Sequence, residues 1–232
     1  MTLPFLVSVP HAGLSVPGEV EGLCILEEQD IIKDSDEGAS EIYYPLKDQV
    51  TAFVTTDTAR AIVDMNRRED DRTKDGVVKT HTCWDVPVYK ELLSEEVITS
   101  LIQRYYRPYH SRISHVSKGI RLGLDCHTMA ELGPPVAPDA GSRRPRVCLS
   151  NGDGSTCPQE WLTFLSGCFC EAFGDDVSVN KPFKGGYITR SHAEEIPWIQ
   201  IELSREPFIS NEEKGRRVLQ AVKTWWEESA GW

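Results

Sequence analysis

Two histidines stand at the ends of short apolar runs. His11 follows "FLVSVP", and His127 lies far along the chain in "GLDCHTM". Two adjacent acids, Asp36 and Glu37, lie between them in "DSDEGAS". Each histidine is either an ordinary loop residue or one arm of a metal site whose other ligands lie far away in the sequence. Asp34 and Asp36 would also suit the N-cap of a following helix.

Further polar residues follow apolar runs. Asn66 and Arg67 come after "AIVDM", and Asn151 comes after "RVCLS". The carboxyl ends of parallel strands border the ligand site of an open sheet, so these side chains are expected to converge. Asp125 precedes His127 by two positions and either orients that histidine or forms hydrogen bonds within a buried strand. Taken singly, each residue also has an ordinary explanation, such as a surface salt bridge for Arg67.

Glu202 lies in "WIQIELS", where polar and apolar residues alternate. A strand with one solvated face would explain the alternation. The remaining histidines carry less information. His81 is ambiguous, and we expect His110, His115 and His192 on helix or loop surfaces.

The elements expected to position these residues alternate between strands and helices. The predicted strands span residues 5–9, 52–56, 61–65, 120–126, 146–150, 176–180 and 198–204. The predicted helices span residues 37–49, 94–118 (interrupted at Pro108), 158–173 and 211–229 (capped by Asn211). Residues 131–145 are rich in glycine and proline and should form a loop. This alternation predicts an α/β fold with a largely parallel sheet covered on both faces.

Composition narrows the class of protein. The 232 residues suit a single α/β domain, and we expect one domain over 1–232. The net charge of −11 argues against binding to nucleic acid or to an anionic membrane. The seven cysteines lack zinc-finger spacing, no leader sequence is recognised, and no apolar segment reaches the ~20 residues of a membrane span. We therefore expect a cytoplasmic protein with reduced thiols.

Seven short motifs occur together in one order along most of the chain: "SVPHAG" (8–13), "DSD" (34–36), "IVDMNR" (62–67), "RPYH" (107–110), "DCHTM" (125–129), "FKGGYITR" (183–190) and "QIEL" (200–203). This combination resembles the N-formylglutamate amidohydrolase family, whereas any one motif alone would be weak. The resemblance implies a three-layer αβα sandwich with a mixed, largely parallel sheet, like that of the zinc carboxypeptidases.

The resemblance also implies roles for particular residues. One Zn²⁺ per chain would be held by His11, Asp36 and His127, with Glu37 as the alternative carboxylate. Glu202 would be the general base and acid. Substrate-binding candidates are Asn66, Arg67, Arg190, Lys184, Gly185 and Gly186.

The implied reaction is hydrolysis of an N-acyl amino acid, N-formyl-L-glutamate in particular, to formate and L-glutamate. Such a reaction belongs to amino-acid metabolism, including histidine degradation. Residues 79–90 fall where the chain is shorter than the family's full-length members, so the reaction class is better supported than the substrate. Two alternatives stay open: a metallocarboxypeptidase-like enzyme acting on a peptide or gamma-linked amide, and a non-catalytic module that binds an acidic metabolite.

Overall fold

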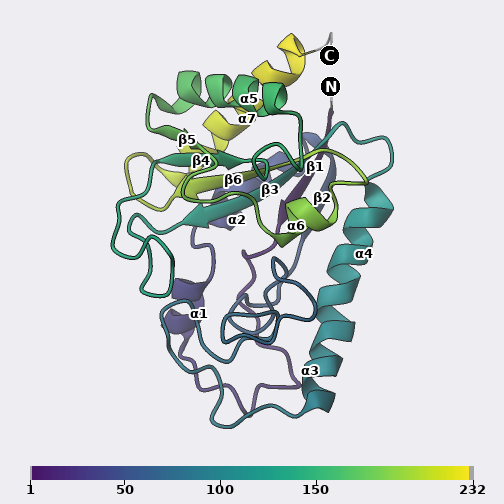
Figure 1. The fold of residues 1–232 in the computed structure, drawn as a ribbon, viewed down its shortest axis with the longest axis vertical. Coiled ribbons are helices and arrows are strands. Elements are labelled where there is room, and N and C mark those ends of the chain that lie inside the picture. The colour runs from purple at the N-terminus through teal and green to yellow at the C-terminus, as the bar shows by residue number, and fades with distance from the viewer. Residues whose placement is uncertain (1, 230–232) are drawn as a thin grey trace.

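The computed structural model describes residues 2–229, which are built around a six-stranded sheet (Figure 1). The strands are β1 (Leu3–Val9), β2 (Val50–Thr55), β3 (Leu122–Met129), β4 (Val147–Ser150), β5 (Val177–Val179) and β6 (Trp198–Ser204), in the order β2-β1-β3-β6-β4-β5. Four strands, β2, β1, β3 and β6, run parallel, whereas β4 is antiparallel to β6. The sheet is therefore mixed and largely parallel, as predicted. Met1 and residues 230–232 of the expected domain lie outside the described residues.

Helices cover both faces of this sheet (Figure 1). One face carries α2 (Ala39–Tyr43), the short 3-10 helix η1 (Tyr44–Leu46), α5 (Gln159–Phe173) and α7 (Asn211–Glu228). The other face carries α3 (Glu95–Leu101), the π turn η2 (Ile102–Tyr106), α4 (Arg107–Val116) and the coil between β2 and α3. Two short helices, α1 (Glu28–Asp34) and α6 (Tyr187–Ser191), complete the chain. This arrangement confirms the αβα sandwich.

The two faces of β3 and β6 differ in chemistry. Leu124 and its same-face neighbours join the apolar core beneath α5 and α7. Because side chains alternate along a strand, Asp125 and His127 point to the opposite face, in register with Gln200 and Glu202. Every residue of β3 and β6 is buried, so Glu202 does not lie on a solvated strand face. The alternation of the sequence instead separates an apolar core from a buried polar site.

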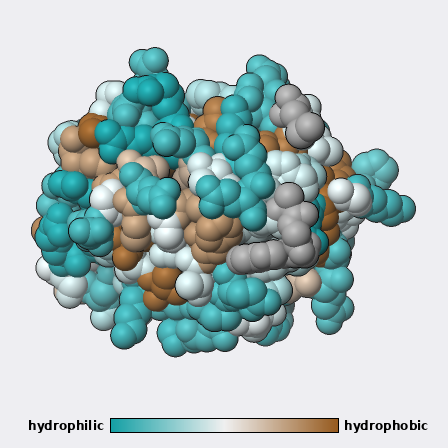
Figure 2. Space-filling model, turned by 90° about the horizontal axis from the view of Figure 1, so that it is seen from above, coloured by the Kyte–Doolittle hydropathy of each residue, from teal (hydrophilic) through white to brown (hydrophobic). Residues whose placement is uncertain are grey.

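The outer surface above α5 and α7 is mainly hydrophilic, with small hydrophobic patches between the polar side chains (Figure 2). Helix α7 buries Val218, Val222 and Trp225 toward the sheet. No helix within residues 2–229 combines the length and apolar character needed to cross a membrane.

The predicted strand over 61–65 is wrong. The segment is coil whose pairing with another segment is limited, among residues 2–229, to an isolated bridge between Val63 and Val78. Ile62, Val63 and Met65 are apolar because they fill the second core, not because they extend a sheet. The Asp64 carboxylate accepts a hydrogen bond from the Asn66 backbone N–H (2.8 Å), which favours a turn at this point.

Three helix predictions need correction. The helix expected over 37–49 is limited to α2 and η1, and it begins after Gly38, whose φ of 81° is outside the helical region. The long helix over 94–118 is continuous but passes through the π turn η2 just before Pro108. A wider turn there accommodates the proline ring and its missing N–H. Helix α7 is capped by Ser210, whose Oγ accepts from the Glu213 N–H, rather than by Asn211.

Gly123 allows β3 to pack against the fully buried Trp198 ring. A Cβ at position 123 would lie 2.3 Å from that ring, so Gly123→Ala should reduce the free energy of unfolding by about 1–3 kcal/mol through overpacking. Gly167→Ala, in exposed space on α5, is the matched control and should stabilise the protein by about 0.5–1 kcal/mol. Urea unfolding of both variants measures the difference. Equal effects of the two substitutions would contradict the packing argument.

Candidate active site

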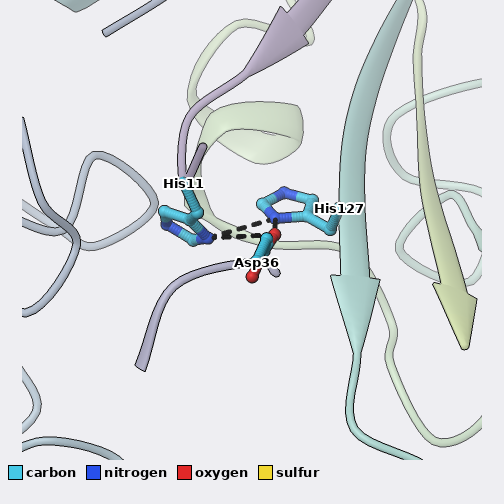
Figure 3. Close-up of side chains that lie close together, drawn as sticks. All are labelled: His11, Asp36 and His127. Carbon is cyan, nitrogen blue, oxygen red and sulfur yellow. Dashed lines mark hydrogen bonds and ion pairs between the residues drawn. The ribbon is translucent and has the colours of Figure 1, made fainter. Parts of the chain in front are cut away.

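Three side chains from separate parts of the chain meet beyond the carboxyl end of β1. His11 follows β1, Asp36 lies in the loop between α1 and α2, and His127 lies within β3, which continues to Met129. All three are buried, and their imidazole and carboxylate groups face one another (Figure 3). One ligand atom of each lies within 4.8 Å of those of the other two, so the three side chains could hold a metal ion together.

The donor atoms of this group are spaced as metal ligands are. The Nδ1 atoms of His11 and His127 are 3.2 Å apart, and Asp36 Oδ2 lies 3.5 Å from the first and 2.9 Å from the second. Ligand atoms at normal bond lengths from a tetrahedral zinc ion are about 3.3 Å apart. The two-imidazole, one-carboxylate donor set therefore fits a zinc ion.

The other nitrogen of each imidazole contacts a buried carboxylate. His11 Nε2 lies 2.8 Å from Asp64 Oδ1, and His127 Nε2 lies 2.9 Å from Asp125 Oδ2. A carboxylate can only accept, so each Nε2 carries a proton and each Nδ1 has its lone pair available when the ring is neutral. Carboxylates behind ligating histidines fix the ring orientation in this way. Asp125 fits both roles weighed for it, because it contacts His127 and also accepts a hydrogen bond from Ser8 Oγ (2.9 Å) on the neighbouring strand β1.

The charges of Asp36 and His127 stabilise each other inside the cluster. Burial would raise the pKa of Asp36, but His11 and His127 outweigh it and hold that pKa well below its usual range. Burial would lower the pKa of His127, but the Asp125 carboxylate outweighs it and raises that pKa well above the usual value. Without an ion, Asp36 and His127 therefore form an ion pair, and the imidazole must lose a proton when a metal binds.

Between the two carboxylates left open by the sequence, the structure brings Asp36 to the group. Its carboxylate also accepts from the Thr128 backbone N–H (3.2 Å), while its own N–H donates to the His11 carbonyl (3.0 Å). Glu37 points into solvent. One backbone step at the start of a helix is enough to separate the directions of the two side chains.

Glu202 faces the same space from β6. Its side chain is buried, and its Oε1 accepts a hydrogen bond from Gln200 Nε2 (2.8 Å). Burial raises the pKa of Glu202, partly offset by the positive charge of His127. A carboxylate with a raised pKa is suited to taking up and giving back a proton.

These residues line a cavity of about 340 Å³, a size typical of small-molecule sites. Its lining carries six cationic side chains against three carboxylates, in a protein of net charge −11. The cationic residues are Lys33, Arg60, Arg67, Arg144, Lys184 and Arg205. The cavity is therefore a local basic site, able to attract a small anion that the rest of the protein would repel.

The predicted substrate-binding residues separate into two groups. Asn66, Arg67, Lys184, Gly185 and Gly186 line the cavity. Gly186 leaves room for Asn66, since a Cβ there would lie 2.2 Å from the amide nitrogen. The structure does not bring Arg190 to the cavity: it is exposed on α6, and it is not among the lining residues of the described part of the chain.

Arg67 is already engaged by acids. Its Nη2 pairs with Asp75 (2.5 Å), its Nε donates to the Asp75 carbonyl (2.8 Å), and its Nη1 lies 3.7 Å from Asp64. The Tyr106 hydroxyl donates to the Arg67 carbonyl (2.8 Å) and holds the backbone of the segment against η2. The guanidinium is thus oriented before any ligand arrives.

Several site residues were missed in the sequence. Asp64 stands inside the motif "IVDMNR" and was the one most open to detection. Lys79 is fully buried between the carboxylates of Asp34 (3.0 Å) and Asp75 (2.6 Å). Nothing in a sequence distinguishes such a lysine from an ordinary surface one. Arg144 lines the cavity from a segment predicted only as a loop.

The placement expected for two histidines and for Asn151 is wrong. His192 is buried and His110 is half-buried: their rings stack 5.2 Å apart, and His110 Nε2 lies 3.0 Å from the Met65 carbonyl. The pair fixes the segment that carries Asn66. Asn151 does not line the cavity, because β4 runs antiparallel to β6 and its carboxyl end therefore points toward the start of β6. It serves the β4–α5 turn, where its side chain donates to the Cys157 carbonyl.

Known proteins resemble this chain over nearly its whole length. The family model for N-formylglutamate amidohydrolase matches residues 3–208. An N-formylglutamate deformylase from Pseudomonas putida is 28% identical over 257 residues, covering 97% of this chain and 94% of the relative. One from Pseudomonas aeruginosa is 24% identical over 226 residues, covering 90% and 84%.

Two solved structures share the fold. The N-formylglutamate amidohydrolase from Ralstonia eutropha JMP134 has a TM-score of 0.79 at 19% identity, covering 100% of this chain and 96% of that one. A gene product from Agrobacterium tumefaciens has a TM-score of 0.72 at 17% identity, covering 95% and 90%. The match of the family model over most of the sequence places this chain in the N-formylglutamate amidohydrolase family.

Proposed function

We propose that this protein is a zinc-dependent amidohydrolase that cleaves N-formyl-L-glutamate to formate and L-glutamate. The observation that carries the proposal is the buried cluster of His11, Asp36 and His127, with Glu202 beside it in a basic cavity. The names of the Pseudomonas relatives support formylglutamate as the substrate. A zinc ion held by the three residues would polarise the amide carbonyl and lower the pKa of water.

The protein's own groups would supply the proton transfers. Glu202 would take a proton from the attacking water and deliver it to the leaving nitrogen. Without that proton the nitrogen would have to leave as an amide anion, which is a poor leaving group. Its pKa is raised by burial, so the protonated form is accessible when the amine has to be protonated. Gln200 restrains the carboxylate through the 2.8 Å hydrogen bond to Oε1.

The substrate carboxylate next to the scissile amide would be held by Asn66 and Arg67. A guanidinium binds a carboxylate through parallel charge-assisted hydrogen bonds, and Asp75 presets its orientation here. Gly185 and Gly186 would allow backbone to approach the ligand closely, and the Lys184 ammonium stands near the mouth of the cavity, paired with Asp153 (2.8 Å).

We also propose that the chain works as one catalytic domain in the cytoplasm. Support comes from the single sheet shared by all six strands and from seven cysteines that are free thiols in the structure. Reduced thiols are typical of that compartment.

A metal analysis combined with a substrate panel tests the function. Purified protein should contain about one zinc per chain and hydrolyse formylglutamate in preference to peptides, gamma-linked amides and other acyl-amino acids. Removal of zinc by a chelator should abolish the activity, and added zinc should restore it. Preferred cleavage of peptides would identify a carboxypeptidase-like enzyme instead. Metal binding without hydrolysis of any amide would identify a binding module.

A further inference from the structure

The segment between β3 and β4 is a preformed wall of the cavity. Its two arms are joined by backbone hydrogen bonds from Gly133 to the Ser142 carbonyl (3.0 Å), from Gly141 to the Gly133 carbonyl (2.9 Å) and from Arg144 to the Glu131 carbonyl (2.8 Å). Residues Pro134, Val136, Ala137, Pro138 and Arg144 of this segment line the cavity. The wall is therefore apolar apart from one cation.

That cation, Arg144, is held in a fixed direction. Its side chain is only 6% exposed, and Nε and Nη2 donate to the two oxygens of Asp139 at 2.7 and 2.8 Å. Its guanidinium also lies over the Phe183 ring, 4.8 Å from the centroid. Both the ion pair and the ring contact orient the guanidinium, so little side-chain entropy remains to be lost when an anion binds.

One edge of this guanidinium remains available. A guanidinium has five N–H groups, and Asp139 uses only the edge formed by Nε and Nη2. No partner for Nη1 occurs among residues 2–229, so the edge formed by Nη1 and Nη2 can still donate hydrogen bonds to a second carboxylate. Asp139 therefore orients Arg144 without consuming its capacity to bind.

The other cavity arginines are committed to different partners. Arg205 donates to the carbonyls of Ser35 and Thr128 and supports the Asp36 loop. Arg60 lies 3.5 Å from Asp36, a member of the metal cluster, and 3.2 Å from Asp64, the acid that contacts His11. Arg67 and Arg205 also lie within 4 Å of Asp64 or Asp36, whereas the carboxylate partner of Arg144 is neither of these acids. Arg144 is the arginine best placed to recognise a part of the substrate that does not react.

We propose that Arg144 is the specificity-determining residue for the distal carboxylate of the substrate, with Asp139 as its positioning residue. The inference rests on the proposed function and assigns the recognition of its acidic substrate to a particular residue. Its proximal end would engage Asn66 and Arg67, its side chain would run along the apolar wall, and its distal carboxylate would meet the free edge of Arg144. An amide in place of that carboxylate presents N–H groups to an arginine, which has no acceptor.

The test compares N-formyl-L-glutamate with its near-isostere N-formyl-L-glutamine. In the wild type we expect kcat/KM to favour formylglutamate by about 100-fold, since a charge-assisted bidentate contact is lost with the amide. In Arg144→Gln the ratio of the two kcat/KM values should fall to within about threefold of unity, mainly because KM for formylglutamate rises. Arg144→Lys should retain an intermediate preference, because the lysine ammonium keeps the positive charge but cannot form the two parallel hydrogen bonds of a guanidinium.

The ratio of two substrates in one variant cancels any loss of folded or metal-loaded protein. Arg143→Gln, which removes the exposed neighbouring cation that does not line the cavity, is the matched control and should keep the wild-type ratio. An unchanged ratio in Arg144→Gln would overturn the proposal, as would loss of the ratio in Arg143→Gln alone.

Binding of the free amino acids separates this inference from the proposed function. Calorimetry of the zinc-loaded protein should show glutamate binding more tightly than glutamine in the wild type and equally weakly in Arg144→Gln. This result would stand even if the wild type hydrolysed neither formyl compound, an outcome that would reject the proposed reaction alone. Equal binding of glutamate and glutamine to the wild type would reject the role of Arg144.

Discussion

Glu202→Gln is expected to lower kcat for amide hydrolysis by about 10²–10⁴-fold while the metal content stays at the wild-type level. The substitution keeps the size of a side chain that is only 7% exposed, and it removes the group that carries the proton. Glu202 is not one of the three clustered donors, so loss of its charge should leave metal binding intact. Steady-state kinetics and metal analysis of the same preparation measure both quantities.

The pH profile provides a further readout for this variant. The limb of kcat/KM that falls toward acid pH as the base is protonated should disappear in Glu202→Gln, because that side chain no longer titrates. Glu206→Gln, two residues after the end of β6, is the matched control and should leave the rate unchanged. Near wild-type turnover by Glu202→Gln would assign the proton transfers to another group.

His127→Ala is expected to abolish both zinc binding and hydrolysis. Two ligands would remain, and the vacated space would lie between the buried acids Asp36 and Asp125, which would lose their shared partner. The exposed His115 on α4 provides the control: His115→Ala should keep one zinc per chain and full activity. A His127→Ala protein that is folded and retains stoichiometric zinc would contradict the site.

A matched pair of adjacent substitutions tests the choice of carboxylate in the same experiment. Asp36→Asn should weaken zinc binding strongly, whereas Glu37→Gln should leave it at the wild-type level, because only Asp36 faces the two imidazoles. Circular dichroism of each variant verifies that the fold persists. Weakened zinc binding in Glu37→Gln together with normal binding in Asp36→Asn would identify Glu37 as the carboxylate ligand.

The fold class could be predicted because apolar periodicity reports burial directly. The runs that became β1, β3 and β6 are buried on both faces, and α5 and α7 carry helical apolar stripes. The same signal failed at residues 61–65, where an apolar run fills a core as coil. Burial and strand geometry coincide often, but the pattern measures only burial.

The sequence by itself determined which residue types were available for the chemistry. His11 and His127 stand out because each comes at the end of an apolar strand run, where parallel strands border a ligand site, and Glu202 stands out by its period of two. The motifs in family order added Asp36 and the segment that carries Asn66. These are local features, readable without knowing which strands are neighbours.

Only the tertiary structure decided which of those residues meet. Because β4 is antiparallel to β6, the carboxyl end of β4, followed by Asn151, points toward the start of β6, and Arg144, just before β4, lies near the end of β6. The choice of Asp36 over Glu37, the exposure of Arg190, and the burial of Lys79 among carboxylates depend likewise on packing between distant segments. Strand direction and the pairing of buried charges are set by contacts far apart in the chain, and a linear pattern does not encode them.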